Sequence, residues 1–485
     1  MQRIIAAIKD LVTHKLQTEV TDIIPMPLSG SDRRYFRVHT PGQSYIATHG
    51  LNIKENNAFI YFSNHFRSKH LPVPEIFCLS EDETIYLQED LGDETLLSRL
   101  ETEGHVDGVK KLFIESLYQL AKLQVLGDAG MDYSKCLTAK EFGKKAITSD
   151  LLYFKYYFLD TLKTPYDKQA MLNDFDALAN YLTHTEYKFF MFRDFQSRNI
   201  MLKDNKPFFV DYQGGMKGAP QYDAASMIWQ ARAELSDEWK KDLLDAYMDG
   251  LDEVMGKKID RYTFVGQYYG YVLIRLLQVL GAYGFRGLFE RKAQFLTSIP
   301  LALRNLKWFI GNRTMGINTP EFKRMLEFIV SDEVIAQFEP QQATMDTPLT
   351  VHINSFSYLQ TGYPADETTN GGGYVFDCRG ILNPGRIEEF KTQTGRDKEV
   401  IDFLEQNTRM PDFVNNVYNI VDISVEDYLK RGFESLSINF GCTGGQHRSV
   451  YAAEQTARHL RNKYKVKTVV HHIEQEKKGW VNERY

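Results

Sequence analysis

The chain has 485 residues, of which 43% are hydrophobic and 25% are charged, and its formal net charge is −6. It is too long for one ordinary hydrophobic core, so we expect two or three domains. The composition is that of a soluble globular protein, which argues against disordered and disulfide-stapled chains. A net charge this small for the length favours no class of charged partner.

The cysteines and the apolar stretches bear on the cellular compartment. The four cysteines are scattered without paired spacing, which argues against a disulfide framework or a zinc site and favours a reducing compartment. The N-terminal residues do not form a signal-peptide pattern. The most apolar long stretch, residues 268–285, contains Arg275, and it predicts a buried helix rather than a membrane span. We therefore expect a cytoplasmic protein that does not enter the membrane.

Residues 1–92 are expected to form a small α/β lobe. After a first helix, the apolar pattern predicts two strands, a helix and two more strands. The strands are expected at 34–40, 43–49, 75–79 and 84–88, and the helix at 53–69. Glu89-Asp90-Leu91-Gly92 then breaks the pattern and is a candidate hinge.

The remainder divides into a helical region, a linker and a second α/β region. From residue 93 to 335 the apolar period is mostly helical, which predicts a large helical lobe. Residues 336–350 hold two prolines and many polar residues without periodicity, so we expect a linker there. Beyond it, apolar runs at 351–356, 374–376, 436–440 and 466–470 alternate with helical stretches. This alternation predicts a separate α/β domain over residues 351–485.

The segment Arg193-Asp194-Phe195-Gln196-Ser197-Arg198-Asn199, followed by Asp211-Tyr212-Gln213, has the layout of a phosphoryl-transfer site. Such a site needs one carboxylate to orient the attacking hydroxyl, and an amide and a second carboxylate to hold Mg²⁺ on the nucleotide phosphates. Asp194 is the candidate base, and Asn199 and Asp211 are the candidate metal ligands. The alternative is a chance match to a loose pattern. The apolar runs on either side argue against chance, because they place the three residues together.

Further motifs carry a resemblance to a known superfamily. They are Ser29-Gly30-Ser31-Asp32-Arg33-Arg34-Tyr35-Phe36-Arg37, Leu87-Gln88-Glu89-Asp90-Leu91-Gly92-Asp93 and Gly218-Ala219-Pro220-Gln221-Tyr222-Asp223-Ala224-Ala225-Ser226. With the catalytic segment, they make residues 1–335 similar to the aminoglycoside phosphotransferase/choline kinase superfamily, and most similar to kinases that phosphorylate N-acetylmuramate and N-acetylglucosamine at the anomeric carbon. The resemblance implies a two-lobed protein-kinase-like fold, with a small lobe over 1–92 and a large lobe over 93–335. It also implies ATP and Mg²⁺ as cofactors and a sugar as substrate.

Two positions depart from that superfamily. Phe192 stands where a His usually precedes the Arg-Asp pair, and strand 43–49 lacks the Lys that protein kinases use to hold the nucleotide phosphates. Candidate nucleotide-binding residues are therefore a phosphate-covering turn and nearby arginines, namely Ser29, Gly30, Ser31, Arg33 and Arg34, with Arg37 as a further cation. The alternatives are a plain turn and arginines that brace the core. Asp223 is interpreted as a helix cap or a loop brace rather than a catalytic residue.

The sequence from Leu436 to Ser449 predicts a buried strand, a glycine-rich loop and the start of a helix that extends over 448–464. Backbone N–H groups of such a loop, with Thr443, His447 and Arg448, make a candidate anion site. Glycines that serve packing alone are the alternative. Cys442 and Arg448 also have the spacing of cysteine phosphatases. However, Gly441 replaces the usual His and no general-acid loop is evident.

Residues 350–480 resemble the C-terminal domain of the RNase adapter protein RapZ. The matching segments are Tyr374-Val375-Phe376-Asp377-Cys378-Arg379, Asn383-Pro384, Thr394-Gly395-Arg396-Asp397-Lys398 and the loop from Gly441 to Val450. That family's domain binds glucosamine-6-phosphate and a small regulatory RNA. The resemblance implies that an amino-sugar phosphate binds at Asp377, Arg379, Thr443, Gly444, His447 and Arg448.

RNA is a weaker expectation than the sugar phosphate. Gln446 replaces a Lys that is usual in the family's loop. A basic tract nevertheless follows the loop, and it would contact RNA phosphates or form a solvated face. It comprises Arg458, Arg461, Lys463, Lys465, Lys467, Lys477 and Lys478.

Together these observations predict a bifunctional protein, with a sugar kinase of cell-wall sugar recycling followed by a domain that binds an amino-sugar phosphate. One alternative is a degenerate kinase that acts as an RNA or protein adapter and senses glucosamine-6-phosphate. Another is a kinase for a non-sugar hydroxyl such as that of choline or an antibiotic, and such a cationic acceptor would need an acidic pocket.

Overall fold

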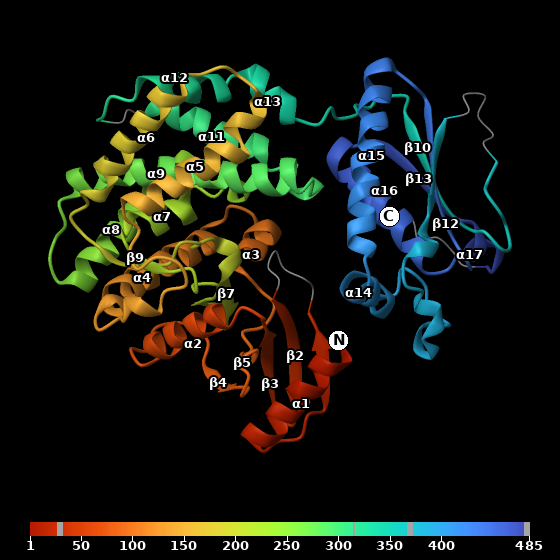
Figure 1. Cartoon of the computed structure of the whole chain (residues 1–485), viewed down its shortest axis with the longest axis horizontal. Coiled ribbons are helices and arrows are strands. Elements are labelled where there is room, and N and C mark those ends of the chain that lie inside the picture. Colours follow the sequence, from red (N-terminus) through yellow and green to blue (C-terminus); the bar gives the residue numbers. More distant parts are fainter. Residues whose placement is uncertain (27–32, 314–315, 366–371, 480–485) are drawn as a thin grey trace. The chain divides into compact units, whose positions relative to one another are not determined.

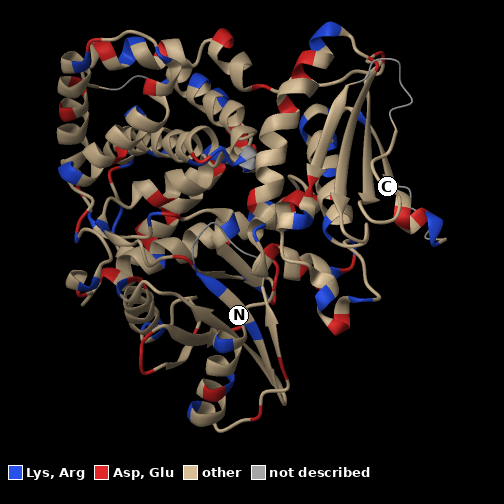
Figure 2. Cartoon of the chain, turned by 45° about the vertical axis from the view of Figure 1, so that its right-hand side comes forward, with Lys and Arg blue, Asp and Glu red and all other residues tan. Residues whose placement is uncertain are grey.

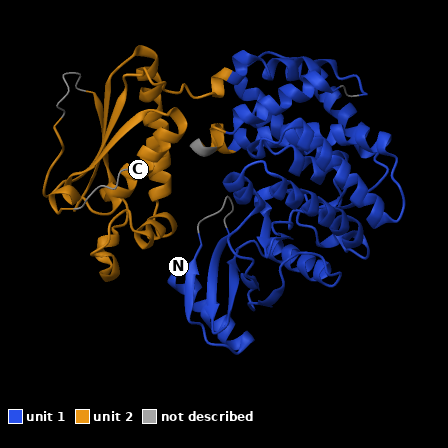
Figure 3. Cartoon of the chain, turned by 180° about the vertical axis from the view of Figure 1, so that it is seen from behind, with its two compact units in different colours: residues 1–285, 298–335 blue, residues 286–297, 336–485 orange. Residues whose placement is uncertain are grey.

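The structure is a computed structural model that describes residues 1–26, 33–313, 316–365 and 372–479, without the side chains of residues 293 and 294. Its contacts divide the chain into two compact units (Figure 3). The first comprises residues 1–285 and 298–335, and the second comprises residues 286–297 and 336–485. The second unit thus takes in a short segment, 286–297, from within the stretch that the sequence assigns to the helical lobe.

The first unit begins with a five-stranded antiparallel sheet in the order β1-β2-β3-β5-β4 (Figure 1). Its elements are α1 (Gln2–Leu16), β1 (Asp22–Pro25), β2 (Arg34–Thr40), β3 (Gln43–His49), α2 (Ile53–Arg67), β4 (Ile76–Leu79) and β5 (Ile85–Glu89). The predicted strands and the helix are confirmed to within about two residues. The sequence analysis missed β1, a short edge strand that ends in a proline and is only partly buried.

The rest of the first unit is mainly helical. Its helices are α3 (Leu96–Glu103), α4 (Asp107–Asp128), α5 (Lys144–Tyr157), α6 (Lys168–Thr183), α7 (Gln221–Ile228), α8 (Asp237–Met255), α9 (Arg261–Tyr283), α11 (Ile299–Asn312), α12 (Pro320–Ile329) and α13 (Asp332–Phe338, which crosses the unit boundary). Two short antiparallel strand pairs interrupt them, formed by β6 (Phe189–Met191) with β9 (Met216–Gly218) and by β7 (Ile200–Lys203) with β8 (Lys206–Phe209). These pairs carry the predicted catalytic segment.

Helix α9 is the central helix of this lobe and packs against α5, α7 and α11. The stretch Arg261–Phe289 is long and apolar enough to cross a membrane by length and composition alone, and 56% of its most apolar window is buried inside the protein. The buried side chains include Phe264, Tyr268 and Arg275. The expectation of a buried helix over this stretch is therefore confirmed for α9.

The second unit holds a four-stranded parallel sheet in the order β11-β12-β10-β13. The strands are β10 (Thr350–Ser357), β11 (Gly373–Asp377), β12 (Ser435–Cys442) and β13 (Lys467–His472), and the helices are α10 (Ala293–Leu296), α14 (Lys398–Asn407), α15 (Met410–Arg431), α16 (Arg448–Tyr464) and α17 (Ile473–Lys477). The predicted strands and the helix over 448–464 are confirmed.

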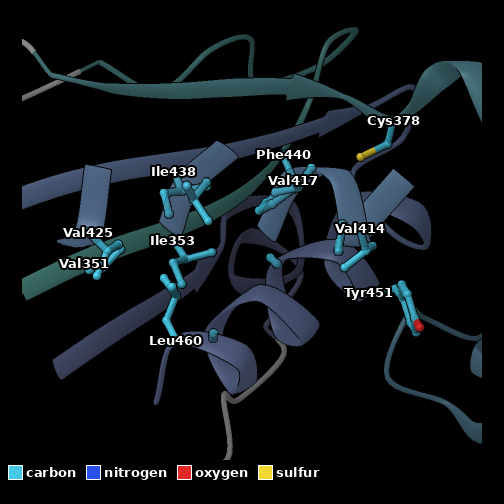
Figure 4. Packing of buried hydrophobic residues seen from close by; sticks show 14 of the residues in the cluster. Val351, Ile353, Cys378, Val414, Val417, Val425, Ile438, Phe440, Tyr451 and Leu460 are labelled. Atoms are coloured by element: carbon cyan, nitrogen blue, oxygen red, sulfur yellow. The ribbon is translucent and has the colours of Figure 1, made fainter. Parts of the chain in front are cut away.

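The core of the second unit lies between this sheet and helices α15 and α16 (Figure 4). Ile353, Ile438 and Phe440 from the strands meet Val417 and Leu460 from the helices. This packing fixes the point where β12 ends and α16 begins, which is where the glycine-rich loop lies. Positive and negative residues are interspersed over both units (Figure 2).

Candidate functional site

The catalytic segment is a loop between β6 and β7 whose backbone is held in an unusual conformation. Arg193 has a φ of 82° and Asp211, at the end of β8, has a φ of 71°. Side chains rarely adopt this left-handed region, and residues held there are typical of functional sites whose surroundings impose the conformation. The buried surroundings here are aromatic, because Phe192 packs edge-on against Phe195 and Tyr212. Phe192 thus takes an apolar role where a His is usual.

Asp223 on α7 braces this loop. Its carboxylate accepts hydrogen bonds from the backbone N–H groups of Phe192 (2.7 Å) and Arg193 (2.9 Å) and from the Gln124 amide (2.9 Å). Burial raises the pKa of Asp223 to about 7, although these donors oppose the shift. The interpretation of Asp223 as a loop brace is confirmed, whereas it does not cap α7, whose N-cap is Pro220 without a side-chain bond.

Arg193 also holds the loop, through a two-pronged ion pair with Asp150 on α5 at 2.8 and 2.9 Å. Its guanidinium lies over the rings of Phe142 and Tyr222. Arg193 therefore points into the helical lobe and anchors the residue that precedes Asp194.

Asp194 is paired with Arg275 of α9, whose Nη2 lies 3.1 Å from Asp194 Oδ1. The side chain of Asp194 is 48% exposed, so its other oxygen remains accessible. Burial acts to raise the pKa of Asp194, but Arg275, Arg193 and Arg198 outweigh it and hold the pKa below its ordinary value. Sequence analysis did not assign this role to Arg275, and a charge inside an apolar helix was the available signal.

The two candidate metal ligands lie together. Asn199 Nδ2 donates to the backbone carbonyl of Asp194 at 2.9 Å and lies 3.4 Å from Asp211 Oδ2. Asp211 Oδ1 accepts from Arg33 and Gln213, each at 2.8 Å. Because Asn199 Nδ2 makes both contacts, the amide oxygen Oδ1 is the atom of Asn199 that could coordinate a metal beside the Asp211 carboxylate. Oxygen ligands of this kind suit Mg²⁺, which usually takes its remaining ligands from phosphates and water. The residues present thus fit the ion at Asn199 and Asp211.

Residues after β8 also tie the catalytic segment to the small lobe. Tyr212 shares a 2.6 Å hydrogen bond with Ser63 of α2 and stacks on Phe59. Together with the Arg33–Asp211 pair, these contacts make the position of Asp211 depend on both lobes.

The predicted nucleotide-binding residues divide into two groups. Ser29, Gly30 and Ser31 lie outside the described residues. Arg33 is buried and paired with Asp211 and Glu55, and Arg37 is paired with Asp90 and Asp93. Arg34 contacts the sulfur of Met1 at 4.0 Å. Arg33 and Arg37 therefore brace acidic residues of the first unit, in line with the bracing alternative.

A pocket opens beside the catalytic loop. It is lined by loop residues Gln196 and Arg198, by Ser226 and Trp229 at the end of α7, and by Arg275 and Tyr283 of α9. Because Arg275 also touches Asp194, the pocket adjoins the candidate base. Among the described residues that line it, none is Asp or Glu.

In the second unit, four predicted site residues come together around Arg448. Its Nη1 donates to the backbone carbonyls of Arg379 (3.1 Å) and Ile381 (2.7 Å), and its Nη2 donates to the Thr443 hydroxyl (3.3 Å). Arg379 is also paired with Asp377 and stacks on Tyr358. The Nε of Arg448 is buried and has no hydrogen-bond partner among the described residues, which leaves one donor for a ligand.

The other loop residues serve mainly to build the loop. His447 Nε2 contacts the Phe390 carbonyl at 2.8 Å, away from this group, and burial lowers the pKa of His447. Gly444 lies in the loop, where a side chain would meet open space. Cys442 is buried, and its sulfur accepts from the Gly445 N–H and contacts the Ser449 hydroxyl. These contacts give Cys442 a structural role rather than that of an exposed nucleophile.

Local packing accounts for the glycine at position 441, and an ion pair occupies one lysine of the basic tract. A side chain at Gly441 would collide with the Tyr358 and Phe356 rings, so the His that is usual in phosphatases does not fit. In the basic tract, Lys463 is only 10% exposed and is paired with Asp422. The tract is therefore not one continuous free cationic surface.

Comparisons with known proteins agree with the division of the chain into two units. A model of the phosphotransferase enzyme family matches residues 23–256, and a model of the RapZ C-terminal domain matches residues 349–476. A nucleotide-binding protein of Fervidobacterium nodosum is 38% identical over 122 residues, which cover 25% of this chain and 41% of that protein. One of Lactobacillus helveticus is 32% identical over 168 residues, which cover 35% and 52%. The chain thus spans about half or less of the length of these curated relatives.

Solved structures with a similar trace include a choline/ethanolamine kinase family protein from Mesorhizobium loti (15% identity, 68% of this chain and 99% of that chain, TM-score 0.46). A choline kinase from Cryptosporidium parvum is a second (15% identity, 67% and 100%, TM-score 0.46). The first unit of the chain therefore contains a region that matches the phosphotransferase enzyme family, and the second unit contains a region that matches the RapZ C-terminal domain.

Proposed function

We propose that the first unit is a kinase that transfers a phosphoryl group from ATP to a sugar, at the anomeric hydroxyl of N-acetylmuramate or N-acetylglucosamine. The observation that carries the proposal is the grouping of Asp194, Asn199 and Asp211, in which Asn199 contacts both other residues. Phosphoryl transfer requires little more of a protein than such positioning and charge stabilisation.

Asp194 acts on the acceptor. Arg275 occupies Oδ1, so Oδ2 is left to accept a hydrogen bond from the sugar hydroxyl and to take its proton as the bond to phosphorus forms. Because the pKa of Asp194 lies below its ordinary value, the carboxylate is ionised at neutral pH. Its main contribution is then to orient the hydroxyl, which suits a loose transition state.

Asn199 and Asp211 would hold Mg²⁺, which when bound would supply positive charge to the phosphate oxygens. Arg33 lies within 2.8 Å of Asp211 Oδ1 and keeps that carboxylate oriented. Since Tyr212 and Arg33 both join Asp211 to the small lobe, a nucleotide held by the small lobe would be aligned with the catalytic loop.

The pocket supports a sugar over a cationic acceptor. The described lining residues include neither Asp nor Glu but three arginines, Arg198, Arg232 and Arg275, whose positive charge would repel choline or an aminoglycoside. Trp229 and Tyr283 instead give aromatic walls, and Gln196 gives an amide. This combination suits a sugar ring and its hydroxyl groups.

For the second unit, we propose an amino-sugar phosphate as ligand. Arg379, Thr443 and Arg448 lie together, and the Nε of Arg448, which is unpaired among the described residues, is a buried donor that a phosphate oxygen would satisfy. A protein in which one unit phosphorylates an amino sugar and the other binds an amino-sugar phosphate would act in cell-wall sugar recycling.

The first test is ³¹P NMR of the full chain with MgATP and, in turn, N-acetylmuramate, N-acetylglucosamine, glucosamine, choline and kanamycin. We expect an acid-labile sugar 1-phosphate that is absent with Asp194→Asn. Asp245→Asn is the matched control, because Asp245 is an exposed carboxylate on α8 that pairs with Lys241.

The outcome also decides between the kinase and the adapter alternative. Product from choline or kanamycin alone would overturn the sugar assignment. Absence of product from every acceptor would favour a degenerate kinase, in which Arg33 holds Asp211 permanently. RNA binding that weakens with salt would then become the next measurement.

A further inference from the structure

The pocket beside the catalytic loop carries more positive charge than the catalytic residues require. Its charged lining residues are Arg198, Arg232 and Arg275. Arg275 is balanced by Asp194 at 3.1 Å. Arg232 has only a loose, exposed pairing with Glu101 at 3.7 Å. Arg198 makes no hydrogen bond or ion pair with another residue in the part of the chain that the structure describes. The pocket is therefore cationic.

Two buried donors in the same pocket have no hydrogen-bond partner among the described residues. They are the hydroxyl of Ser226, which is 1% exposed, and the Nε of Arg275, which is 4% exposed as a residue. Both residues line the pocket. Leaving a buried polar group unpaired costs free energy, so such groups in native proteins usually meet a ligand or water.

The surroundings of Tyr283 agree with a positive potential in this pocket. Burial raises the pKa of its hydroxyl, while Arg198, Arg275 and Arg232 each act to lower it. All three arginines therefore act electrostatically on one wall of the pocket, which concentrates their effect on a ligand bound there.

We propose that the acceptor carries a negatively charged group, a carboxylate or a phosphate, and that Arg198 and Arg232 select for it. This inference rests on the proposed kinase function and narrows its substrate class. A planar guanidinium matches either anion with paired hydrogen bonds. Arg198 lies on the same loop as Asp194 and Asn199, so an anion held by Arg198 would fix the reacting hydroxyl relative to the base.

The test uses acceptors that share a sugar ring and differ in charge. N-acetylmuramate carries a carboxylate, N-acetylglucosamine 6-phosphate carries a phosphate, and N-acetylglucosamine is neutral. We expect kcat/KM for one of the anionic sugars to exceed that for the neutral sugar at least tenfold. The anionic sugar with the higher kcat/KM then shows whether the pocket selects a carboxylate or a phosphate.

Substitutions then assign the preference to residues. Arg198→Gln should lower kcat/KM for the preferred anionic sugar roughly ten- to hundredfold, mainly through KM, as expected for loss of a charge-assisted hydrogen bond. The value for the neutral sugar should fall by a smaller factor, so that the ratio of kcat/KM for the anionic sugar to kcat/KM for the neutral sugar decreases. Arg232→Gln should act in the same direction, and Arg198→Lys should restore part of the preference. Arg67→Gln, at a surface arginine paired with Glu75, is the matched control.

Equal losses for charged and neutral sugars would show that Arg198 only supports the loop, and a preference for the neutral sugar would overturn the inference. Binding separates this inference from the kinase proposal. If no sugar is phosphorylated, calorimetric titration of wild type and Arg198→Gln with the same three sugars still tests whether the pocket selects an anionic sugar. Binding of an anionic sugar that depends on Arg198 would support the inference without the kinase. No binding, or equal binding of all three, would overturn it.

Discussion

Arg275 lies 3.1 Å from the carboxylate of Asp194, although one residue belongs to the loop after β6 and the other to the middle of α9. The pair links the candidate base to the central helix of the lobe. Because Arg275 also lines the pocket beside the catalytic loop, one side chain contacts both this pocket and the candidate base.

Replacing Arg275 should change the pH dependence of the reaction. Arg275 is the strongest influence that lowers the pKa of Asp194 against the effect of burial. The active form is the carboxylate, so activity is lost as pH falls through this pKa. Arg275→Met should raise the pKa and move the acid limb of the kcat/KM profile to higher pH. Arg275→Lys, which keeps the charge, should move it less. An unmoved acid limb in Arg275→Met would contradict the role of the pair.

Asp223 should matter for stability more than for chemistry. Asp223→Ala leaves the N–H groups of Phe192 and Arg193 without their acceptor, and each buried unpaired group costs about 1–3 kcal/mol. We expect the free energy of unfolding of the first unit to fall by about 3 kcal/mol in urea titrations. Asp245→Ala, at an exposed position of α8, should change it by less than about 0.5 kcal/mol. An equally small effect of Asp223→Ala would exclude the brace.

Asn199 should determine the requirement for magnesium. Its amide lies beside Asp211 Oδ2, and its removal leaves one carboxylate to hold the ion. Asn199→Ala should therefore raise the Mg²⁺ concentration for half-maximal activity by roughly tenfold or more, in the range seen when groups that support metal ligands are lost. Titration of activity with Mg²⁺ at saturating ATP measures this. An unchanged requirement would place the metal elsewhere.

Local sequence patterns were sufficient to predict most strands and the grouping of Asp194, Asn199 and Asp211. Strand β2 alternates in burial and strand β3 contains a short run of buried residues, which are both patterns of strands. The polar loop of the catalytic segment is short, so the chain itself brings these residues together. The glycine-rich loop between β12 and α16 was predictable for the same reason. In both cases the signal lay within about twenty residues.

Contacts between distant segments were not predictable from the pattern. Asp150 holds Arg193 and Arg275 holds Asp194, and each pair joins separate helices and loops whose packing no local periodicity specifies. Arg33 was one of several cations near a predicted turn, and only the fold shows it against Asp211. The charge of the pocket beside the catalytic loop likewise arises from three segments that are remote in sequence.

In the second unit, Arg379 and Arg448 should respond differently to substitution. Arg379 is about half exposed, so Arg379→Ala should weaken glucosamine-6-phosphate binding by roughly tenfold, as expected for one charged hydrogen bond, without loss of stability. Arg448 donates to two carbonyls and to Thr443, so Arg448→Ala should weaken binding and also lower the melting temperature. Calorimetry and thermal unfolding separate the two effects. Unchanged affinity in both variants would remove the sugar phosphate from this site.

Glu454 of α16 should make the second unit sensitive to acid. Its Oε1 lies 2.9 Å from Nε2 of the fully buried His472 and 2.7 Å from Nε of Arg396. Burial raises the pKa of Glu454, but the hydrogen bonds from His472 and Arg396 outweigh it and lower the pKa to about 2, against an ordinary value of 4.5. The unfolded chain therefore binds a proton at a higher pH than the folded one does.

The stability that Glu454 contributes is present above pH 4.5 and is lost as pH falls from there toward 2. By linkage it amounts to at most on the order of 3 kcal/mol. Glu454→Gln should thus speed amide hydrogen exchange in α16 and β13 near neutral pH, and the difference from wild type should shrink as pH is lowered below 4.5. Glu405→Gln, on α14 beside Tyr451, controls for loss of a carboxylate near α16. A difference that stays constant with pH would show that packing, rather than the charge on Glu454, stabilises this part of the unit.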